Sequence, residues 1–230
     1  MATSAPPGSA PDQPRFAIVL AGGSGRRLGF LDKPGLIVAG QSLLTRALGA
    51  VVPALTVVVG PQRDLPAGVL RISEDPPHGG PAAGLAAGLA LLARDHGIRS
   101  GIDLVAVLAA DLPGIDGPAV QSLALAVRRA GVDGAVLIDP GGRDQYLAGV
   151  WRVGALLTAT RSRASWHGGR LSDLLGPLVG ARVPAGWSVA ADIDTTADLL
   201  QWGATAPVAG SGRTTPIRDC EEAGDDGVVR

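Results

Sequence analysis

Short runs of apolar residues alternate along the chain with longer segments that carry apolar residues at helical spacing. Residues 16–21 are continuously apolar, which predicts a strand covered on both faces. Similar runs predict strands at 55–60, 69–72, 104–110, 135–138 and 146–151. Helical patterns fall at 41–51, 81–94, 118–130, 171–178 and 196–202. This alternation favours an α/β fold with a doubly wound, mostly parallel sheet and helices on both faces.

The two ends of the chain differ in composition from the middle. Residues 1–15 are rich in proline, and residues 204–230 are rich in glycine, proline, threonine and charge. Such segments bury too little apolar surface to offset the conformational entropy of the chain. The sequence therefore predicts a disordered tail at 1–15, one domain at 16–203 and a disordered tail at 204–230. Both tails are expected to be dispensable for stability.

Composition and charge narrow the range of partners. The formal net charge of −1 gives no reason to expect a nucleic acid or a membrane surface as partner. No apolar stretch is long enough to span a bilayer, and the N-terminus does not resemble a signal peptide. The single cysteine, Cys220, suits a reducing cytoplasm. We expect a cytoplasmic protein that is a monomer or a weak homo-oligomer.

The loop after the first predicted strand combines glycines with cations. Gly22 and Gly23 free the backbone to turn its N–H groups toward an anion, and Arg27 and Lys33 follow in the same loop. This combination favours a bound triphosphate over an ordinary turn with surface arginines. The spacing fits neither the G-x-G-x-x-G dinucleotide fingerprint nor the G-K-[ST] phosphate loop.

Carboxylates follow other predicted strands. Asp111 ends a run of apolar residues, and a carboxylate there favours a magnesium site over a simple cap. Asp75 could accept two N–H bonds from a guanine edge or lie in a solvated turn, and the sequence leaves both open. Asp192 and Asp194 alternate, so both are expected on one side of a strand. They could contact metal, or Asp194 or Thr195 could cap the next helix.

These motifs resemble those of a known family. The segment LAGGSGRRLGFLDKP is similar to the signature of the sugar-nucleotide-type nucleotidyltransferases. EDPPHGGPAAGL, LAADLPGI, GRDQYLAGVWR and DIDTTADL resemble successive segments of the molybdenum cofactor guanylyltransferases. The resemblance implies a Rossmann-like sheet of the nucleotidyltransferase type and transfer of GMP from GTP to the terminal phosphate of molybdopterin, with release of pyrophosphate and Mg2+ as cofactor.

The resemblance also implies roles for individual residues. Lys33 would contact phosphate, and Asp111 would hold the metal. In the reaction that this implies, Arg27, Lys33 and Asp111 are the catalytic candidates, while Asp194 is a second candidate metal ligand on its alternation with Asp192 alone. The nucleotide would be bound by Leu20, Ala21, Gly22, Gly23, Lys33, Gln62, Asp75 and Asp111. Asp75 would read the guanine.

Two departures from the family pattern keep alternatives open. Asp192 and Asp194 stand where the guanylyltransferases have asparagine, and Gln62 also replaces an asparagine. The D-x-D-T form is more similar to cytidylyltransferase and phospholactate guanylyltransferase relatives. The acceptor could therefore be a phosphosugar or phospholactate, or molybdopterin could receive a cytidylyl group. A nucleotide-binding module without catalysis is less favoured, because Lys33 and Asp111 are both present.

Overall fold

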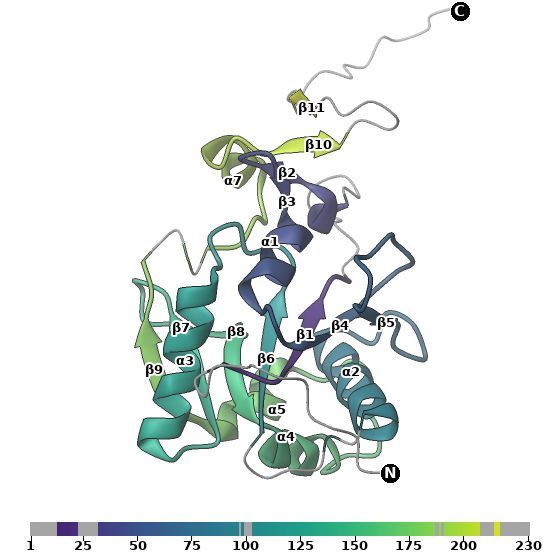
Figure 1. The fold of residues 1–230 in the computed structure, drawn as a ribbon, viewed down its shortest axis with the longest axis vertical. Coiled ribbons are helices and arrows are strands. Elements are labelled where there is room, and N and C mark those ends of the chain that lie inside the picture. The colour runs from purple at the N-terminus through teal and green to yellow at the C-terminus, as the bar shows by residue number, and fades with distance from the viewer. Residues whose placement is uncertain are drawn as a thin grey trace, which may run out of the picture.

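The structure, a computed structural model, describes residues 13–22, 32–96, 98, 103–186, 189, 191–207 and 214–216. Its main sheet has seven strands in the order β5-β4-β1-β6-β8-β7-β9 (Figure 1). Their bounds are β1 Phe16–Leu20, β4 Leu55–Val59, β5 Leu70–Ile72, β6 Leu104–Ala109, β7 Gly134–Ile138, β8 Asp144–Arg152 and β9 Val179–Pro184. Strands β5, β4, β1 and β6 are parallel, whereas β8 runs antiparallel to both of its neighbours. The predicted α/β class is confirmed.

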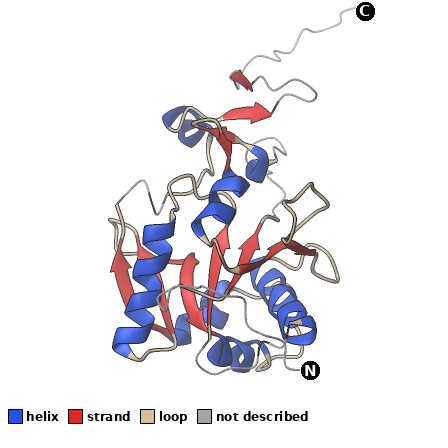
Figure 2. Ribbon diagram, viewed as in Figure 1, coloured by secondary structure: helices blue, strands red, loops and turns tan. Residues whose placement is uncertain are grey.

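Helices cover both faces of this sheet (Figure 2). On one face α1 (Leu43–Ala50) and α3 (Gly117–Ala130) pack on the side of β1 that carries Ala17 and Val19. On the other face α2 (Pro81–Asp95), α4 (Val153–Thr160) and α5 (Leu171–Leu175) pack on the side that carries Ile18. Because β1 is buried on both faces, its continuous apolar run is the pattern that a central parallel strand requires.

Helix α2 packs closely on the sheet, where a glycine faces β1 and β4. A side chain at Gly88 would lie 3.0 Å from methyl carbons of both Ile18 and Val59. The helix begins at Pro81, whose fixed φ suits the first helical position, and Gly80 before it has a φ of 84°. The positive φ of Gly80 therefore sets the turn into α2, and the lack of a side chain at Gly88 lets the helix approach β1 and β4.

A second, four-stranded sheet has the order β11-β10-β2-β3. It lies beyond the carboxyl ends of the main strands, at the top of Figure 1. Its strands are β2 Ile37–Val38, β3 Gln41–Ser42, β10 Thr205–Pro207 and β11 Thr214–Pro216. The same region contains α7 (Thr196–Gln201) and the 3-10 helix η2 (Lys33–Gly35). A second 3-10 helix, η3 (Gly176–Leu178), follows α5 on the large sheet. A separate small core holds this region together, formed by Leu36, Val38, Leu43, Ile193, Leu199 and Ala204.

Several expectations from the sequence need correction. The predicted helix at 171–178 ends at Leu175 and continues as η3, while α4 and β9 were not predicted. The segment 204–230 is not disordered from its start, because Ala204 is buried and Thr205 of β10 pairs with Ile37 of β2. Strand β11 also lies within that segment. No helix in the described part of the chain is long and apolar enough to cross a membrane.

Candidate nucleotide-binding site

The ends of β1, β4 and β6 are tied together at the carboxyl edge of the main sheet. Ala21 donates its backbone N–H to Val59 at 2.8 Å, and Ala110 donates to Leu20 at 2.9 Å. A side chain at Gly60 would lie 2.8 Å from the backbone of Ala21, so this close approach requires glycine. Leu20 and Ala21 are buried, and Gly22 is exposed beyond them. The edge therefore presents Gly22 at the start of the glycine-rich loop. In sheets of this kind ligands bind at such an edge.

Two predicted residues of this loop, Gly23 and Arg27, lie outside the described residues. The next described residue is Asp32, whose carboxylate accepts a hydrogen bond from Arg63 at 3.1 Å. The same guanidinium nitrogen of Arg63 lies 3.4 Å from the carbonyl oxygen of Ala21. Arg63 therefore links the two ends of the glycine-rich loop.

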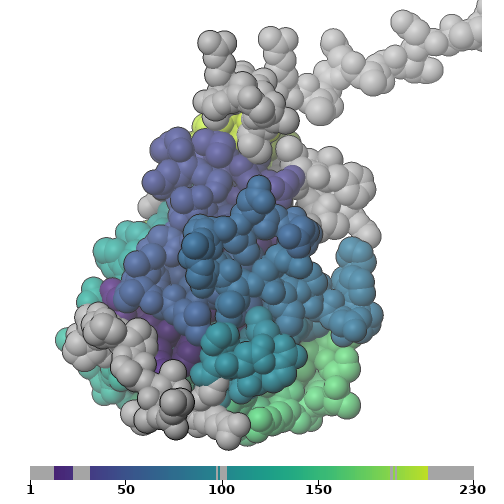
Figure 3. All heavy atoms as spheres, turned by 45° about the vertical axis from the view of Figure 1, so that its right-hand side comes forward, coloured from purple at the N-terminus to yellow at the C-terminus, as the bar shows by residue number. Residues whose placement is uncertain are grey.

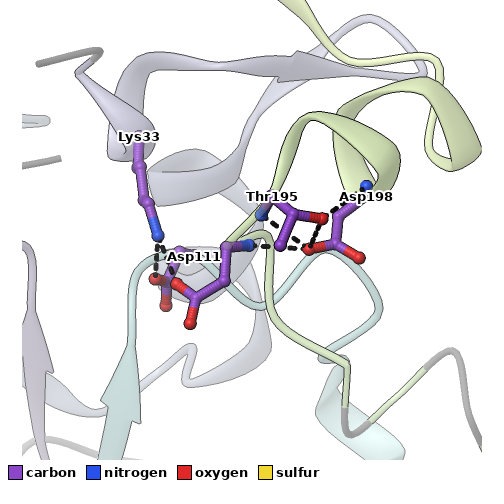
Figure 4. A network of polar contacts seen from close by, with 5 residues as sticks. Lys33, Asp111, Thr195 and Asp198 are labelled. Carbon is purple, nitrogen blue, oxygen red and sulfur yellow. Dashed lines mark hydrogen bonds and ion pairs between the residues drawn. The ribbon is translucent and has the colours of Figure 1, made fainter. Parts of the chain in front are cut away.

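Lys33 lies between carboxylates from distant parts of the chain (Figure 4). Its ammonium donates to Asp194 at 2.5 Å and lies 3.8 Å from a carboxylate oxygen of Asp111. The Lys33 side chain is only 17% exposed, so this network is partly shielded from water. The structure thus brings together Lys33, Asp111 and Asp194, three residues that the sequence predicted for one site.

The electrostatics of Asp111 differ from those of an ordinary surface carboxylate. Burial raises the pKa of Asp111 to about 6, Lys33 opposes this rise, and the charges of Asp192 and Asp194 add to it. Partial burial, followed by the charge of Asp194, also raises the pKa of Asp192. Crowded carboxylates favour a cation in their midst, since each anion disfavours ionisation of its neighbours.

The segment that carries Asp192 and Asp194 is a loop, so the predicted strand at this position is wrong. Thr195 caps α7, as one of the two open interpretations expected, in a capping box with Asp198. The loop is anchored by Ile193, which is fully buried and donates its N–H to the carbonyl of Asp111 at 3.3 Å. Local bonds and burial, rather than strand pairing, therefore place Asp194 beside Lys33.

The predicted base-binding residues Gln62 and Asp75 follow β4 and β5. Asp75 and Glu74 line a pocket of about 230 Å³ whose other walls are α2 and residues 160–167. The two walls are joined, because Gly168 donates its N–H to Gly79 at 2.8 Å. In Figure 3 the green surface of the later chain meets the blue and teal surface around α2. Gln62 is exposed after β4, and neither an ion pair nor a hydrogen bond joins Asp75 to Lys33.

Two residues of the site were missed in the sequence. Arg63 was visible as a cation after the second predicted strand, but nothing in the pattern indicated its bonds to Ala21 and Asp32. Asp198 could have been found, since Thr195 and Asp198 have the T-x-x-D spacing of a capping box.

The donor set fits a magnesium ion. The carboxylate oxygens of Asp111 and Asp194 are ligands of the kind that magnesium prefers, and the Lys33 ammonium shows that a cation is stabilised between them. No group of three or more His, Cys, Asp or Glu side chains is placed to hold a metal among the described residues. Magnesium that bridges phosphates commonly uses only one or two carboxylates, which agrees with this arrangement.

Comparison with known proteins identifies relatives. The family model described as MobA-like NTP transferase domain matches residues 17–178. A molybdenum cofactor guanylyltransferase from Cereibacter sphaeroides is 32% identical over 143 residues, which cover 60% of this chain and 69% of the relative. A protein of the same name from Acidiphilium cryptum (strain JF-5) is 35% identical over 146 residues, which cover 60% and 67%.

Solved structures share the fold. Molybdopterin-guanine dinucleotide biosynthesis protein A from Archaeoglobus fulgidus aligns with a TM-score of 0.59 at 20% identity, over 81% of this chain and 95% of that one. A 2-C-methyl-D-erythritol 4-phosphate cytidylyltransferase from Thermus thermophilus aligns with a TM-score of 0.52 at 18% identity, over 80% and 95%. The family predicted from the motifs is confirmed, because the family model matches most of the chain. The chain belongs to the MobA-like NTP transferase family.

Proposed function

We propose that this protein transfers GMP from GTP to the terminal phosphate of molybdopterin and releases pyrophosphate. The observation that carries the proposal is the Lys33 network at the carboxyl edge of the sheet, beside the start of the glycine-rich loop. The names of the relatives, molybdenum cofactor guanylyltransferase, support guanine as the base and molybdopterin as the acceptor. GTP and magnesium are both available in the cytoplasm, where we place the reaction.

In this reaction an oxygen of the acceptor phosphate attacks the α-phosphorus of GTP. A new P–O bond forms, the bond between the α-phosphorus and the bridging oxygen breaks, and pyrophosphate leaves with the electron pair. The attacking phosphate is already anionic, so no side chain has to act as general base. The protein is left with positioning and charge stabilisation, as in phosphoryl transfer generally.

Leu20, Ala21, Gly22 and Gly23 would hold the nucleotide through backbone N–H groups. Lys33 would stabilise charge on the transferred and leaving phosphates, and Arg27 would act beside it. Asp111, with Asp194 as second candidate, would hold magnesium, which supplies positive charge to the phosphates when bound. The ion pairs of Lys33 with both carboxylates support this assignment. Phosphate oxygens can take the place of the carboxylates beside Lys33, and a metal ion can take the place of the ammonium beside the carboxylates.

The guanine base would be read by Asp75 and flanked by Gln62. A carboxylate accepts from the N1–H and the N2 amino group of guanine together, and adenine offers no such pair. Asp75 is exposed after β5, in the segment that leads to the start of α2. Its position beside the strand end supports the role, since the base has to lie at this edge.

A second candidate is transfer of a different nucleotide or to a different acceptor. It is favoured by Asp192 and Asp194, which replace the two asparagines of the guanylyltransferase pattern. The experiment that separates the candidates measures pyrophosphate release by the full chain with each of four nucleoside triphosphates, with and without molybdopterin. We expect release only with GTP and molybdopterin together, and a Lys33→Ala control should be inactive. Preference for CTP, or release with a phosphosugar or phospholactate instead, would overturn the proposal.

A further inference from the structure

Lys33 is the one lysine in the sequence, and its position depends on a side chain from the other end of the domain. It begins η2 in the four-stranded region, and its ammonium bonds to Asp194. Asp194 precedes α7 in a loop without strand pairing. The question is therefore what holds Asp194 in place.

Asp198 provides the bonds that hold this loop. One oxygen of its carboxylate, Oδ2, accepts from the backbone N–H of Asp194 at 3.0 Å and from that of Thr195 at 2.7 Å. The same oxygen accepts from the Thr195 hydroxyl at 2.8 Å. Figure 4 shows Thr195 and Asp198 facing each other at the start of α7. A capping box requires only the bonds to Thr195, so the bond to Asp194 goes beyond the cap.

We propose that Asp198 is a positioning residue for Lys33, acting through Asp194. The proposal rests on the proposed function for its effect on catalysis, but the contacts that carry it do not. Two links connect Asp198 to Lys33: Asp198 accepts a hydrogen bond from the backbone of Asp194, and Asp194 pairs with Lys33. Lys33 in turn lies 3.8 Å from Asp111. A charged group at a reaction centre has to be held within a fraction of an ångström, so loss of the first link should misplace the ammonium.

The competing explanation is that Asp198 only caps α7 and contributes to stability. Two variants separate the two explanations. Thr195→Val removes the hydroxyl, which accepts from the Asp198 N–H at 3.2 Å and donates to Asp198 Oδ2 at 2.8 Å, and it retains both the Asp194 N–H and the carboxylate oxygen that accepts from it. Asp116→Ala removes a cap of the same residue type from α3, where Asp116 accepts from the N–H of Ala119 at 2.9 Å. Both controls weaken a helix start without releasing Asp194.

The test uses the full chain labelled with [15N]lysine, because a single lysine gives a single side-chain ammonium signal. We expect Asp198→Ala to move this signal toward that of a free lysine, whereas Thr195→Val and Asp116→Ala leave it near its wild-type position. Asp198→Asn should retain much of the wild-type signal, since its amide oxygen can still accept. If the alanine variant does not fold, Asp198→Ser takes its place. A wild-type ammonium signal in a folded Asp198→Ala or Asp198→Ser variant would overturn the proposal.

Kinetics provide the second readout. Asp198→Ala should lower kcat by about 10- to 100-fold, and the two controls should lower it by less than about twofold. Equal losses of kcat in Asp198→Ala and Asp116→Ala would reduce Asp198 to a cap. Absence of pyrophosphate release by the wild-type protein with every triphosphate would count against the proposed function alone, because the ammonium signal reports on Lys33 without any substrate.

Discussion

The seven-stranded sheet and the four-stranded sheet draw on different parts of the chain. The strands of the large sheet all lie between Phe16 and Pro184, and one segment between β1 and β4 belongs to the small region instead. The small region joins residues 33–43 to residues 193–207 and 214–216, and its core is separate from the two cores that flank the large sheet. One region is thus built mostly from neighbours in sequence and the other from the two ends of the domain.

The difference matters because the candidate site lies at the junction of the two regions. Asp111 belongs to the end of β6 in the large sheet, whereas Lys33 and Asp194 belong to the small region. Asp111 is linked to the small region by its ion pair with Lys33 and by the hydrogen bond that its carbonyl accepts from Ile193. Catalysis should therefore respond to changes in the small region more strongly than its size suggests.

The largest effect is expected from the carboxylate of the large sheet. Asp111→Asn should lower kcat by about 10²- to 10³-fold, because a neutral amide cannot balance a cation beside the phosphates. Asp194→Asn, on the small region, should lower kcat by less than about tenfold, since asparagine retains an oxygen that can accept from Lys33. Pyrophosphate release at saturating magnesium measures both. Equal losses would show that the two regions contribute equivalent ligands.

The next comparison tests the two cores. Leu36 in the small core and Leu123 in the large one are both fully buried, and replacement by alanine should cost about 2–5 kcal/mol of unfolding free energy in each case. Leu36→Ala should also lower kcat, because Leu36 supports the segment that carries Lys33. Leu123→Ala should leave kcat unchanged under conditions where the variant is folded. Urea unfolding and initial rates decide this, and an unaltered kcat in Leu36→Ala would contradict it.

The large sheet was predictable because its signals are local. The strands β1, β4 and β6 are continuous apolar runs, and the starts of α2 and α7 carry residues typical of helix starts. The small region gives no comparable signal. Its strands are two or three residues long, too short to show a period of two.

Three charged residues of the candidate site could be named from the sequence, but their contacts could not. Charged residues that follow predicted strands indicated Lys33, Asp111 and Asp194 as candidates for binding phosphate or metal. The ion pair between Lys33 and Asp194 joins residues 161 positions apart, and no spacing rule reaches that far. The alternation of Asp192 and Asp194 was misread as a strand, because a buried Ile193 between two acids has the same pattern in an anchored loop.

The guanine prediction concerns the large sheet alone. Asp75→Ala should raise the KM for GTP and flatten the preference for GTP over ATP by at least about 10- to 100-fold, which is the loss expected from one charged hydrogen bond of about 1.5–3 kcal/mol. Asp75 lies far from the small core in sequence, so melting temperature should change little. Kinetics with GTP, ATP and CTP on a variant of confirmed fold measure the preference. An unaltered preference with reduced stability would show that Asp75 only fixes the turn.

The two regions should also respond to pH with opposite sign. Burial raises the pKa of Asp111 to about 6, from 3.8 for an ordinary aspartate. Between these values the folded protein binds more protons than the unfolded chain, so this group's contribution to stability is present at low pH and is lost as pH rises through about 6. For Asp198, burial tends to raise the pKa, but the hydrogen bonds from Thr195 and the Asp194 amide outweigh it and leave the pKa lowered. Its contribution is lost as pH falls.

The free energy of unfolding of wild type and variants is measured as a function of pH, with a chelator present to keep the protein free of metal. The free energy of unfolding of Asp111→Asn, relative to wild type, should rise between pH 4 and pH 7 by at most about 3 kcal/mol. Asp198→Asn should show its deficit at pH 7 and lose it toward pH 3. Parallel pH profiles for wild type and Asp111→Asn would mean that Asp111 is not destabilised by its ionisation.

The smallest effect is expected from the end of the chain, where the sequence and the structure disagree. A chain that ends at Gly203 loses the burial of Ala204 and the pairing of Thr205 with Ile37. Loss of about 1 kcal/mol should lower the melting temperature by about 2–4 °C in a protein of this size. A chain that ends at Pro216 keeps β10 and β11 and should melt with the full-length protein. The Gly203 chain should also lose activity, because β10 supports the segment that leads from Lys33 into α1, whereas the Pro216 chain should keep it. If all three chains melt together and turn over GTP at the same rate, β10 adds nothing to the small region and the domain ends at Gly203, as the composition of the chain first indicated.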